Sequence, residues 1–288
     1  MGIGDDLIWL SEVQKKRQAK EIKKNIFPIG AWSDIWNNIT YIKKKFDSGC
    51  EKIHTRTNNK PPYLKRFKSK FNLYNFFFSL KTNWITQKII RLITIIDPPL
   101  KIEFCNYNIR KAKLNLSFNE ILKSQAKLKK HKIQDKFIII NPDIKGTFSD
   151  LNKRWPISKW KVLIKMINLE KNQIVRFIYE KNQTHIHGVT NIKVQNIREA
   201  MGIINKARLI ITTEGGLHHL AAAFDRKCIC IMGSFISPRQ TGYKKQKNIF
   251  FPQNKYPTGS LRLDKDCLKS MNAISSSRIS NLIKAYFI

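Results

Sequence analysis

The strongest constraint on the fold is a regular alternation of short β-branched runs and helical patterns that begins at residue 137. Residues 137–140 read FIII and stop at Asn141-Pro142, which predicts a buried strand. Strands alternating with helices predict βαβ units, in which a parallel sheet is covered on both faces. We therefore expect an α/β fold whose ligands bind beyond the carboxyl ends of the strands. The predicted strands are 137–140, 174–179, 209–212 and 228–232, and the predicted helices are 160–167, with Ser158 as its cap, 197–204 and 217–224.

Residues 1–130 have a less regular pattern. Short apolar clusters are broken by Lys-rich stretches, and a single helix is predicted, from Ser11 to Asn25. The polar segment 127–132 precedes the first clear strand, so we place a domain boundary there. The expected division is a first domain over 1–130, a second over 131–275 and a terminal helix over 276–288.

The composition limits the class of protein. The 288 residues are 42% hydrophobic, enough to bury a substantial core, and this excludes a wholly disordered chain. No apolar run approaches the roughly 20 residues that cross a bilayer, and the N-terminus lacks the features of a signal peptide, so a cytoplasmic protein is expected. The five cysteines are scattered without a CxxC pair, which favours buried reduced thiols.

The chain is strongly basic. Lys and Arg number 54 against 20 Asp and Glu, which gives a net charge of +34. Such a charge predicts attraction to polyanions such as nucleic acid, anionic lipid or phosphorylated sugars. The basic residues are spread along the chain, and no recognised nucleic-acid-binding motif accompanies them. The charge favours an anionic partner, and a nucleic-acid-binding protein stays an alternative that rests on charge alone.

The segment richest in chemistry is 212–223, which reads TTEGGLHHLAAA and joins a predicted strand to a predicted helix. Its two glycines permit a tight turn and let backbone N–H groups approach a ligand closely. The start of the following helix offers free N–H groups and a positive dipole end, which suit a phosphate. Glu214 is placed to accept hydrogen bonds from a hydroxylated ligand such as a ribose. A plain strand-to-helix turn is the alternative interpretation.

A second segment, 141–156, follows the first predicted strand. It is long for a strand-to-helix loop, and long loops in compact domains are usually functional or disordered. Its hydroxyls, Thr147 and Ser149, and its cations, Lys153 and Arg154, are suited to a pyrophosphate. Trp155-Pro156 is expected to pin the loop to the next helix. A solvated basic loop is the alternative in so Lys-rich a chain.

The third segment is Gly2-Ile3-Gly4-Asp5-Asp6, which is interpreted as a turn into a helix, where Asp is also a good cap. The sequence begins at this loop, so the first strand that should feed it is expected to be missing. Two further patterns, Asp264-Lys265-Asp266 and His185-x-His187, formally match metal-binding spacings. We interpret both as surface features and assign no metal ligand.

The three segments, in this order, resemble glycosyltransferase family 9, the heptosyltransferase-like enzymes of bacterial surface-polysaccharide assembly. The resemblance is strong over about 137–275 and in the first dozen residues, and weak between. It implies the GT-B architecture, in which two Rossmann-like domains with parallel sheets face a central cleft. It also implies an enzyme that transfers a sugar from a nucleotide donor such as ADP-heptose, inverting the anomeric centre without a metal or other cofactor.

The resemblance also implies roles for particular residues. The family's general base falls on Asp5, and the Lys of its Lys-x-Trp-Pro element, a phosphate ligand, falls on Lys153. Its Asp-x-Gly-x-x-His turn falls on 214–219, where Glu214 replaces the Asp. The catalytic residue that we expect is Asp5, and the donor-binding residues are Thr147, Ser149, Lys153, Arg154, Glu214, Gly215, Gly216 and His219.

The implied partners are a nucleotide-sugar donor resembling ADP-heptose and an anionic glycolipid or saccharide acceptor, such as lipopolysaccharide. The basic surface favours peripheral contact with an anionic membrane, at the cytoplasmic face of the inner membrane. No specific nucleic acid is expected as a partner, because no nucleic-acid-binding motif is present. One alternative from another class is a catalytically inactive relative that still binds a nucleotide, which the Glu at 214 and the missing first strand motivate.

Overall fold

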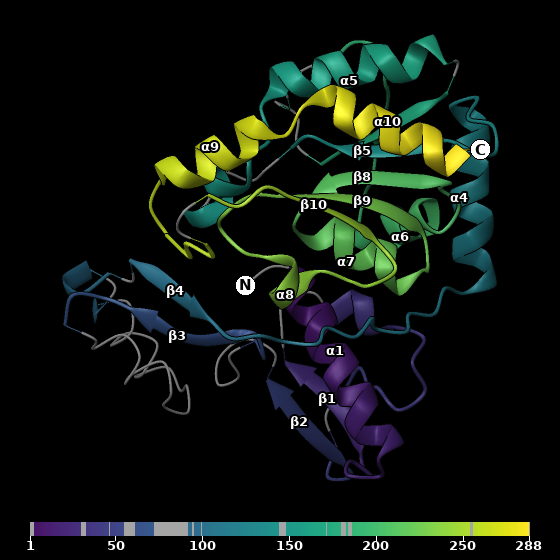
Figure 1. The fold of residues 1–288 in the computed structure, drawn as a ribbon. Helices are drawn as coiled ribbons and strands as arrows, with labels where there is room; N and C mark the ends of the chain where they lie inside the picture. Colours follow the sequence, from purple (N-terminus) through teal and green to yellow (C-terminus); the bar gives the residue numbers. More distant parts are fainter. Residues whose placement is uncertain are drawn as a thin grey trace.

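Figure 1 shows the chain as a computed structural model, which describes residues 3–287 apart from 30–32, 46, 55–60, 72–91, 94, 99, 144–147, 171, 180–182, 184–185 and 254–255. Its centre is a six-stranded parallel sheet. The α/β fold class that the alternating pattern predicts is therefore confirmed. The strands of this sheet are β5 (Ile138–Asn141), β6 (Ile174–Ile178), β7 (Thr190–Lys193), β8 (Leu209–Thr213), β9 (Lys227–Met232) and β10 (Lys247–Phe250).

The strand order identifies where the sheet can bind a ligand. The order is β10-β9-β8-β5-β6-β7, so the chain moves outward from β5 on one side and then returns to build the other side from β8. The connections therefore change direction between β5 and β8, whose registers pair Ile139 with Ile210 and Asn141 with Thr212. Ligands of such sheets bind in the crevice at this switch point. The loops after β5 and β8 hold the predicted donor-binding residues.

Alternate side chains of the sheet enter two core clusters on opposite faces. Ile138 and Ile211 lie in the cluster that includes side chains of α5 (Ile157–Leu169) and α10 (Ser276–Phe287). Ile139 and Ile210 lie in the other cluster, with side chains of α6 (Ile197–Ile204) and α7 (Gly216–Ala223). In Figure 1, α5 and α10 lie above the sheet and α6 and α7 below it. This two-sided burial explains the unbroken apolar runs of the strands.

The described strands of residues 1–130 form two smaller sheets. β1 (Asn25–Ile29) pairs in parallel with β2 (Cys50–His54), and β3 (Leu64–Lys68) pairs antiparallel with β4 (Lys101–Phe104). The 3-10 turn η1 (Ser33–Trp36) lies between β1 and β2 along the chain. These strands are short, and the irregular pattern of residues 1–130 did not predict them.

The first helix, α1 (Ile3–Gln18), corrects two sequence predictions. The helix predicted from Ser11 to Asn25 begins eight residues earlier, and the presumed loop at its start lies inside its first turn. The apolar residues Leu7, Leu10 and Val13 are buried in the same cluster as α7, so packing on the second half fixes this start. Lys20, with a φ of 59°, stands in the left-handed region just past the end.

Other helices follow the sequence more closely. α5 begins at Ile157, earlier than the helix predicted over 160–167. Pro156 occupies its N-cap position and no side chain caps it, so the prediction that Ser158 is the cap is wrong. α4 (Phe118–Lys130) packs on α6, with Glu120 paired to Arg198, although it precedes the predicted boundary at residue 130. That division of the chain stays a prediction. The remaining helices within the described residues are η2 (Phe148–Lys153), α8 (Pro238–Thr241) and α9 (Lys265–Ala273).

Candidate functional site

The candidate site is built around Glu214, which follows β8 and precedes α7. Its side chain is buried, and its Oε2 atom lies 2.6 Å from the Nζ atom of Lys153, at the end of the turn after β5. The two residues therefore come from the two loops that flank the switch point. Phe235 underlies the ammonium group, with 5.0 Å from Nζ to the ring centroid.

The ion pair holds both groups in their charged forms. Burial alone raises the pKa of Glu214, but Lys153, His219 and His218 outweigh it and keep that pKa well below its usual range. Burial alone lowers the pKa of Lys153, but Glu214, Asp150 and Asp5 outweigh it and the pKa is raised. A buried pair of this kind is costly to break from one side, because the remaining charge is left without a partner.

Two glycines bring the N-terminal ends of α1 and α7 into contact. A Cβ atom on Gly216 would lie 2.0 Å from Cγ2 of Ile3, and a Cβ atom on Gly4 would lie 2.5 Å from Cδ2 of His219. Only glycine allows so close an approach at either position. The Gly-Asp segment at the start of the chain and the Gly-rich turn after β8, more than 200 residues apart, therefore meet in one place.

Asp5 lies in the first turn of α1 beside this contact. The Tyr63 hydroxyl donates a hydrogen bond to Oδ1 of Asp5 at 2.5 Å. Asp5 is also close enough to Lys153 to contribute to the raised pKa of that lysine. Asp5, Lys153, Glu214 and His219 thus form one charged cluster between the two helix starts. We refer to these four residues as the charged cluster.

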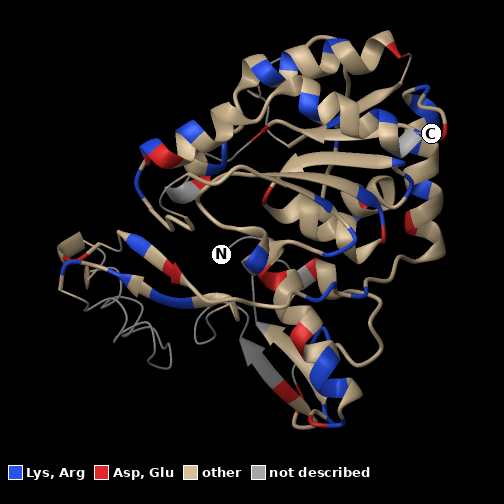
Figure 2. Ribbon diagram, viewed as in Figure 1, with Lys and Arg blue, Asp and Glu red and all other residues tan. Residues whose placement is uncertain are grey.

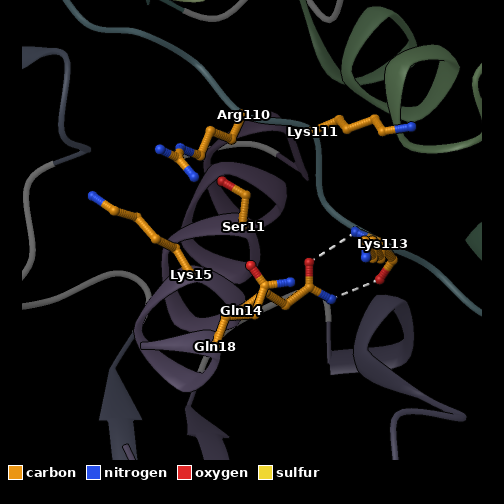
Figure 3. Close-up of a pocket in the computed structure, with 7 residues that line it drawn as sticks. All are labelled: Ser11, Gln14, Lys15, Gln18, Arg110, Lys111 and Lys113. Carbon is orange, nitrogen blue, oxygen red and sulfur yellow. Dashed lines mark hydrogen bonds between the residues drawn. The ribbon is translucent and has the colours of Figure 1, made fainter. Parts of the chain in front are cut away.

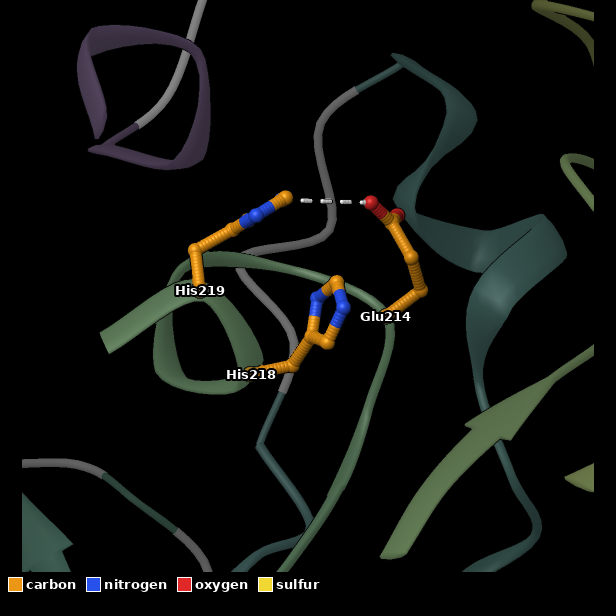
Figure 4. Close-up of side chains that lie close together, drawn as sticks. All are labelled: Glu214, His218 and His219. Atoms are coloured by element: carbon orange, nitrogen blue, oxygen red, sulfur yellow. Dashed lines mark ion pairs between the residues drawn. The ribbon is translucent and has the colours of Figure 1, made fainter. Parts of the chain in front are cut away.

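The two histidines of α7 differ in their surroundings. Nδ1 of His219 lies 2.9 Å from the Tyr243 hydroxyl, and its Nε2 lies 3.7 Å from Oε1 of Glu214. His218 is fully buried, and burial together with the neighbouring His219 lowers its pKa to about 3. His218 is therefore a neutral imidazole at physiological pH. In Figure 4 both imidazole rings lie toward the Glu214 carboxylate.

Glu214, His218 and His219 also have the residue types of a metal site. One ligand atom from each lies within 4.8 Å of the others, and no further group of this kind was found among the described residues. Imidazole nitrogens and a carboxylate suit a transition metal. The Lys153 ammonium beside Glu214 disfavours a divalent cation at the same carboxylate, because like charges repel at this range.

The other predicted site residues lie outside the charged cluster or outside the described part of the chain. Thr147 is not among the described residues, and Ser149 is described only as backbone of η2. Arg154 is exposed, next to the inward-facing Lys153. Gly215 is the N-cap residue of α7, where no side chain caps the helix.

The two weak metal patterns have ordinary surroundings where they are described. Asp264 is the N-cap of α9, and its side chain accepts the N–H groups of Asp266 and Cys267. His185 lies outside the described residues, and His187 is exposed. Asp264 is thus a half-buried helix cap rather than the solvated surface residue that the sequence predicted.

Sequence reasoning assigned no role to two tyrosines of the site. Tyr243 lies within 137–275, the range that the family resemblance covers, so the sequence offered a reason to consider it. Tyr63 had none, because it lies in the irregular first half, 58 residues from its partner Asp5.

A basic hollow of about 300 Å³ lies farther along α1 and shares no residue with the charged cluster. It is lined by α1 and by the segment that leads from β4 to α4, and it exposes Lys15, Arg110 and Lys113 (Figure 3). Lys111 in the same segment pairs with Asp225 at the end of α7. Figure 2 shows Lys and Arg on elements throughout the molecule rather than on one face. The hollow is thus a local feature suited to an anion within a generally basic surface.

Comparison with known proteins identifies the fold and the family. The sequence model of glycosyltransferase family 9 (heptosyltransferase) matches residues 100–265. A search of curated protein sequences gave no match. Among solved structures, the family 9 glycosyl transferase from Veillonella parvula DSM 2008 is 11% identical, with a TM-score of 0.61 over 99% of this chain and 94% of its own.

Two other solved structures extend the comparison. The iron-containing dodecameric glycosyltransferase TibC from enterotoxigenic E. coli H10407 is 13% identical, with a TM-score of 0.59 over 100% of this chain and 74% of its own. The ADP-heptose lps heptosyltransferase II of E. coli is 18% identical, with a TM-score of 0.47, and this chain covers 55% of its length. The likenesses to the Veillonella parvula transferase and to TibC show that the fold is of the GT-B type.

Proposed function

The chain belongs to glycosyltransferase family 9, and from this premise we propose that it transfers a sugar, heptose or a close relative, from a nucleotide-diphosphate donor to a surface-glycan acceptor. The observation that carries the proposal is the contact between the starts of α1 and α7. It gathers a carboxylate suited to be a base and a lysine suited to bind a diphosphate within one charged cluster.

In the proposed reaction, Asp5 acts as the general base. It takes the proton of an acceptor hydroxyl as that oxygen attacks the anomeric carbon of the donor. The bond from the anomeric carbon to the diphosphate oxygen breaks on the opposite side, so the configuration at this carbon inverts. The nucleoside diphosphate leaves with the bonding electron pair.

Lys153 and the start of α7 would stabilise the negative charge of the departing diphosphate. Lys153 supplies a full positive charge, and the backbone N–H groups from Gly216 onward supply partial charges in a fixed orientation. Gly215 and His219 lie in the same turn, and Glu214 would accept a hydroxyl of the nucleotide. We also propose that Thr147, Ser149 and Arg154, in the loop after β5, contact the donor.

We propose that the transfer needs no divalent cation or other cofactor, because Lys153 already places positive charge where the leaving group accumulates negative charge. Glu214, His218 and His219 have the residue types of a metal site, so the metal-free proposal needs a test. Chelation by EDTA should leave both donor binding and turnover unchanged.

We propose an anionic acceptor, such as lipopolysaccharide or a related glycolipid, and work at the cytoplasmic face of the inner membrane. The net charge of +34 and the basic hollow beside α1 support an anionic partner. In the part of the chain that the structure describes, no helix is both long and apolar enough to cross a membrane.

The test is a panel of nucleoside diphosphates and nucleotide sugars measured by thermal shift, followed by a transfer assay with the donor that binds. We expect ADP or an ADP-sugar to raise the unfolding temperature equally with and without EDTA. A shift that disappears with EDTA would contradict the metal-free proposal. If no nucleotide produces a shift, the donor-binding proposal is wrong.

An inactive nucleotide-binding relative is the second candidate. Two observations favour it: Glu214 already engages Lys153, and Ile3 covers Gly216 at the start of α7. Binding of ADP-sugar without release of ADP, with every tested acceptor, would support this candidate over the enzyme.

A further inference from the structure

Two tyrosines hold two carboxylates on the same face of α1. The Tyr63 hydroxyl donates to Asp5, and the Tyr107 hydroxyl donates to Glu12. Asp5 and Glu12 are seven residues apart, a spacing that places both side chains on one face of a helix. Only the first pair lies at the charged cluster; the second lies nearly two turns farther along α1.

The backbone and ring of Tyr63 are fixed by its neighbours. Its carbonyl accepts the N–H of Cys105, next to β4, and its ring lies 6.1 Å from the Phe104 ring, centroid to centroid. The strand pair β3–β4 thus supports the hydroxyl that reaches Asp5. A donor held by two strands has little freedom to follow a moving partner.

The hydroxyl is also held in its protonated form. Burial, followed by the negative charges of Asp5 and Glu214, raises the pKa of Tyr63 well above its usual value. Tyr63 therefore donates a proton in the hydrogen bond to Asp5 throughout the physiological pH range. The hydroxyl thus donates to Oδ1 of Asp5 and does not compete with that oxygen for a proton.

We propose that Tyr63 is a positioning residue that orients the Asp5 carboxylate for proton abstraction. This inference rests on the proposed role of Asp5 as the base. Tyr63 keeps the carboxylate in one rotamer beside the starts of α1 and α7, where the acceptor hydroxyl would meet the anomeric carbon. Without that hydrogen bond the carboxylate samples orientations in which its oxygen points away from the hydroxyl, and the fraction of productive encounters falls.

A positioning role and a purely structural role make different kinetic predictions. Orientation of the base matters in the transition state, so its loss lowers kcat while the donor KM stays the same. The expected loss of kcat is roughly 10- to 150-fold, which corresponds to about 1.5–3 kcal/mol for a hydrogen bond to a charged group. General loss of packing would instead lower the unfolding temperature and weaken ADP binding.

The experiment compares Tyr63→Phe with Tyr107→Phe in the full chain. Each substitution removes one hydroxyl and keeps the ring, and Tyr107 serves as the matched control because its carboxylate partner lies outside the charged cluster. We expect Tyr63→Phe to lower kcat at least tenfold with an unchanged ADP-induced thermal shift. Tyr107→Phe should change kcat less than twofold. Equal kcat values for the two variants would overturn the inference.

Asp5→Asn separates this inference from the proposed function. If Asp5→Asn retains wild-type kcat, the base assignment itself is wrong. If Asp5→Asn is inactive and Tyr63→Phe is fully active, only the positioning role is wrong. In the double variant, Tyr63→Phe should cause no further loss of kcat beyond that of Asp5→Asn. If the two residues had independent structural roles, their fold-losses of kcat would multiply.

A second measurement covers the case in which Tyr63→Phe folds poorly. The kcat values of both Phe variants are expressed relative to the amount of folded protein, measured by circular dichroism. A positioning role predicts that the loss at Tyr63→Phe remains at least tenfold on this scale. A loss that disappears on this scale would contradict the positioning role.

Discussion

The six-stranded sheet and the small sheets of residues 1–130 are stabilised in different ways. Every residue from Ile138 to Ile140 is buried, because helices cover both faces of the central sheet. In β3, by contrast, Leu64 is buried while each of the other four residues is exposed or half-buried. The central sheet thus fixes its own site residues, Lys153 and Glu214. Asp5 depends on how α1 packs against α7.

This difference divides the site into two kinds of residue. Lys153 and Glu214 follow strands whose register is set by a two-sided core. Asp5 is placed by Leu7 and Leu10, which share a core cluster with Leu217 and Leu220 of α7. Changes at the α1–α7 contact should therefore affect the proposed base, and changes at the loops after β5 and β8 should affect the donor.

The largest effect is expected from Asp5→Asn. Loss of a general base lowers turnover by about a hundredfold or more, while ADP should still raise the unfolding temperature. Glu12→Gln, on the same face of α1, is the matched control and should retain turnover. Steady-state kinetics measures both variants. If Asp5→Asn keeps most of its turnover, Asp5 is not the base and α1 contributes only packing.

A smaller effect on the other side of the site is expected from Lys153→Met. It removes the ammonium group that is proposed to bind the donor diphosphate, so ADP binding should fall. It also leaves the buried Glu214 without its partner, so the free energy of unfolding should fall by about 3 kcal/mol. Calorimetry and thermal melts measure the two quantities.

A second substitution separates these two consequences. The double variant Lys153→Met/Glu214→Gln should recover stability but not ADP binding, because it removes the unpaired charge without restoring the cation. Lys161→Met, an exposed lysine on α5, is the control and should change neither. Recovery of ADP binding in the double variant would contradict the phosphate role of Lys153.

The contact between α1 and α7 is tested by Gly216→Ala. The new Cβ would overlap Cγ2 of Ile3, so the free energy of unfolding should fall by about 1–3 kcal/mol and kcat should fall with it. Adding Ile3→Ala removes the overlap and should restore both. Gly49→Ala, in an exposed turn, is the control. Full stability in the single variant would mean that the two helix starts do not touch.

The smallest effect concerns the pH dependence of stability. Burial lowers the pKa of His218 to about 3 in the folded chain, against 6.5 when unfolded, so the unfolded state binds more protons below pH 6.5. The stability contribution is complete above pH 6.5 and declines toward pH 3, with a slope of at most about 1.4 kcal/mol per pH unit. Unfolding temperatures between pH 6.5 and 5 measure it.

A single substitution isolates His218 in that pH range. His218→Leu removes the buried imidazole and should flatten the slope. An unchanged slope in the His218 variant would show that this imidazole is not buried in its neutral form.

The sequence predicted those parts of the fold whose burial is continuous. The runs at β5, β8 and β9 were located because each is apolar without interruption and is bounded by turn residues. β7 was missed because Ile192 is its only fully buried residue, which gives too short a signal to recognise. The start of α1 was misplaced because its first turn is fixed by contacts with α7, and a local pattern cannot show them.

The same reasoning explains what was found of the site. The rule that ligands bind beyond the ends of parallel strands, together with the family resemblance, pointed to the two loops that hold Lys153 and Glu214. Tyr63 could not be found, because it precedes a strand with no clear alternation and its partner is distant in the sequence. Arg154 was predicted with Lys153, but adjacent residues at the end of a 3-10 turn point in different directions, and Arg154 is exposed.

The most direct test is a crystal structure with the donor nucleotide, or with ADP, bound. We predict that the diphosphate lies against Nζ of Lys153 and the first N–H groups of α7, within reach of Asp5, and that Lys153 turns from Glu214 toward the phosphate oxygens. A nucleotide bound elsewhere, with the Lys153–Glu214 pair unchanged, would contradict the assignment of this site.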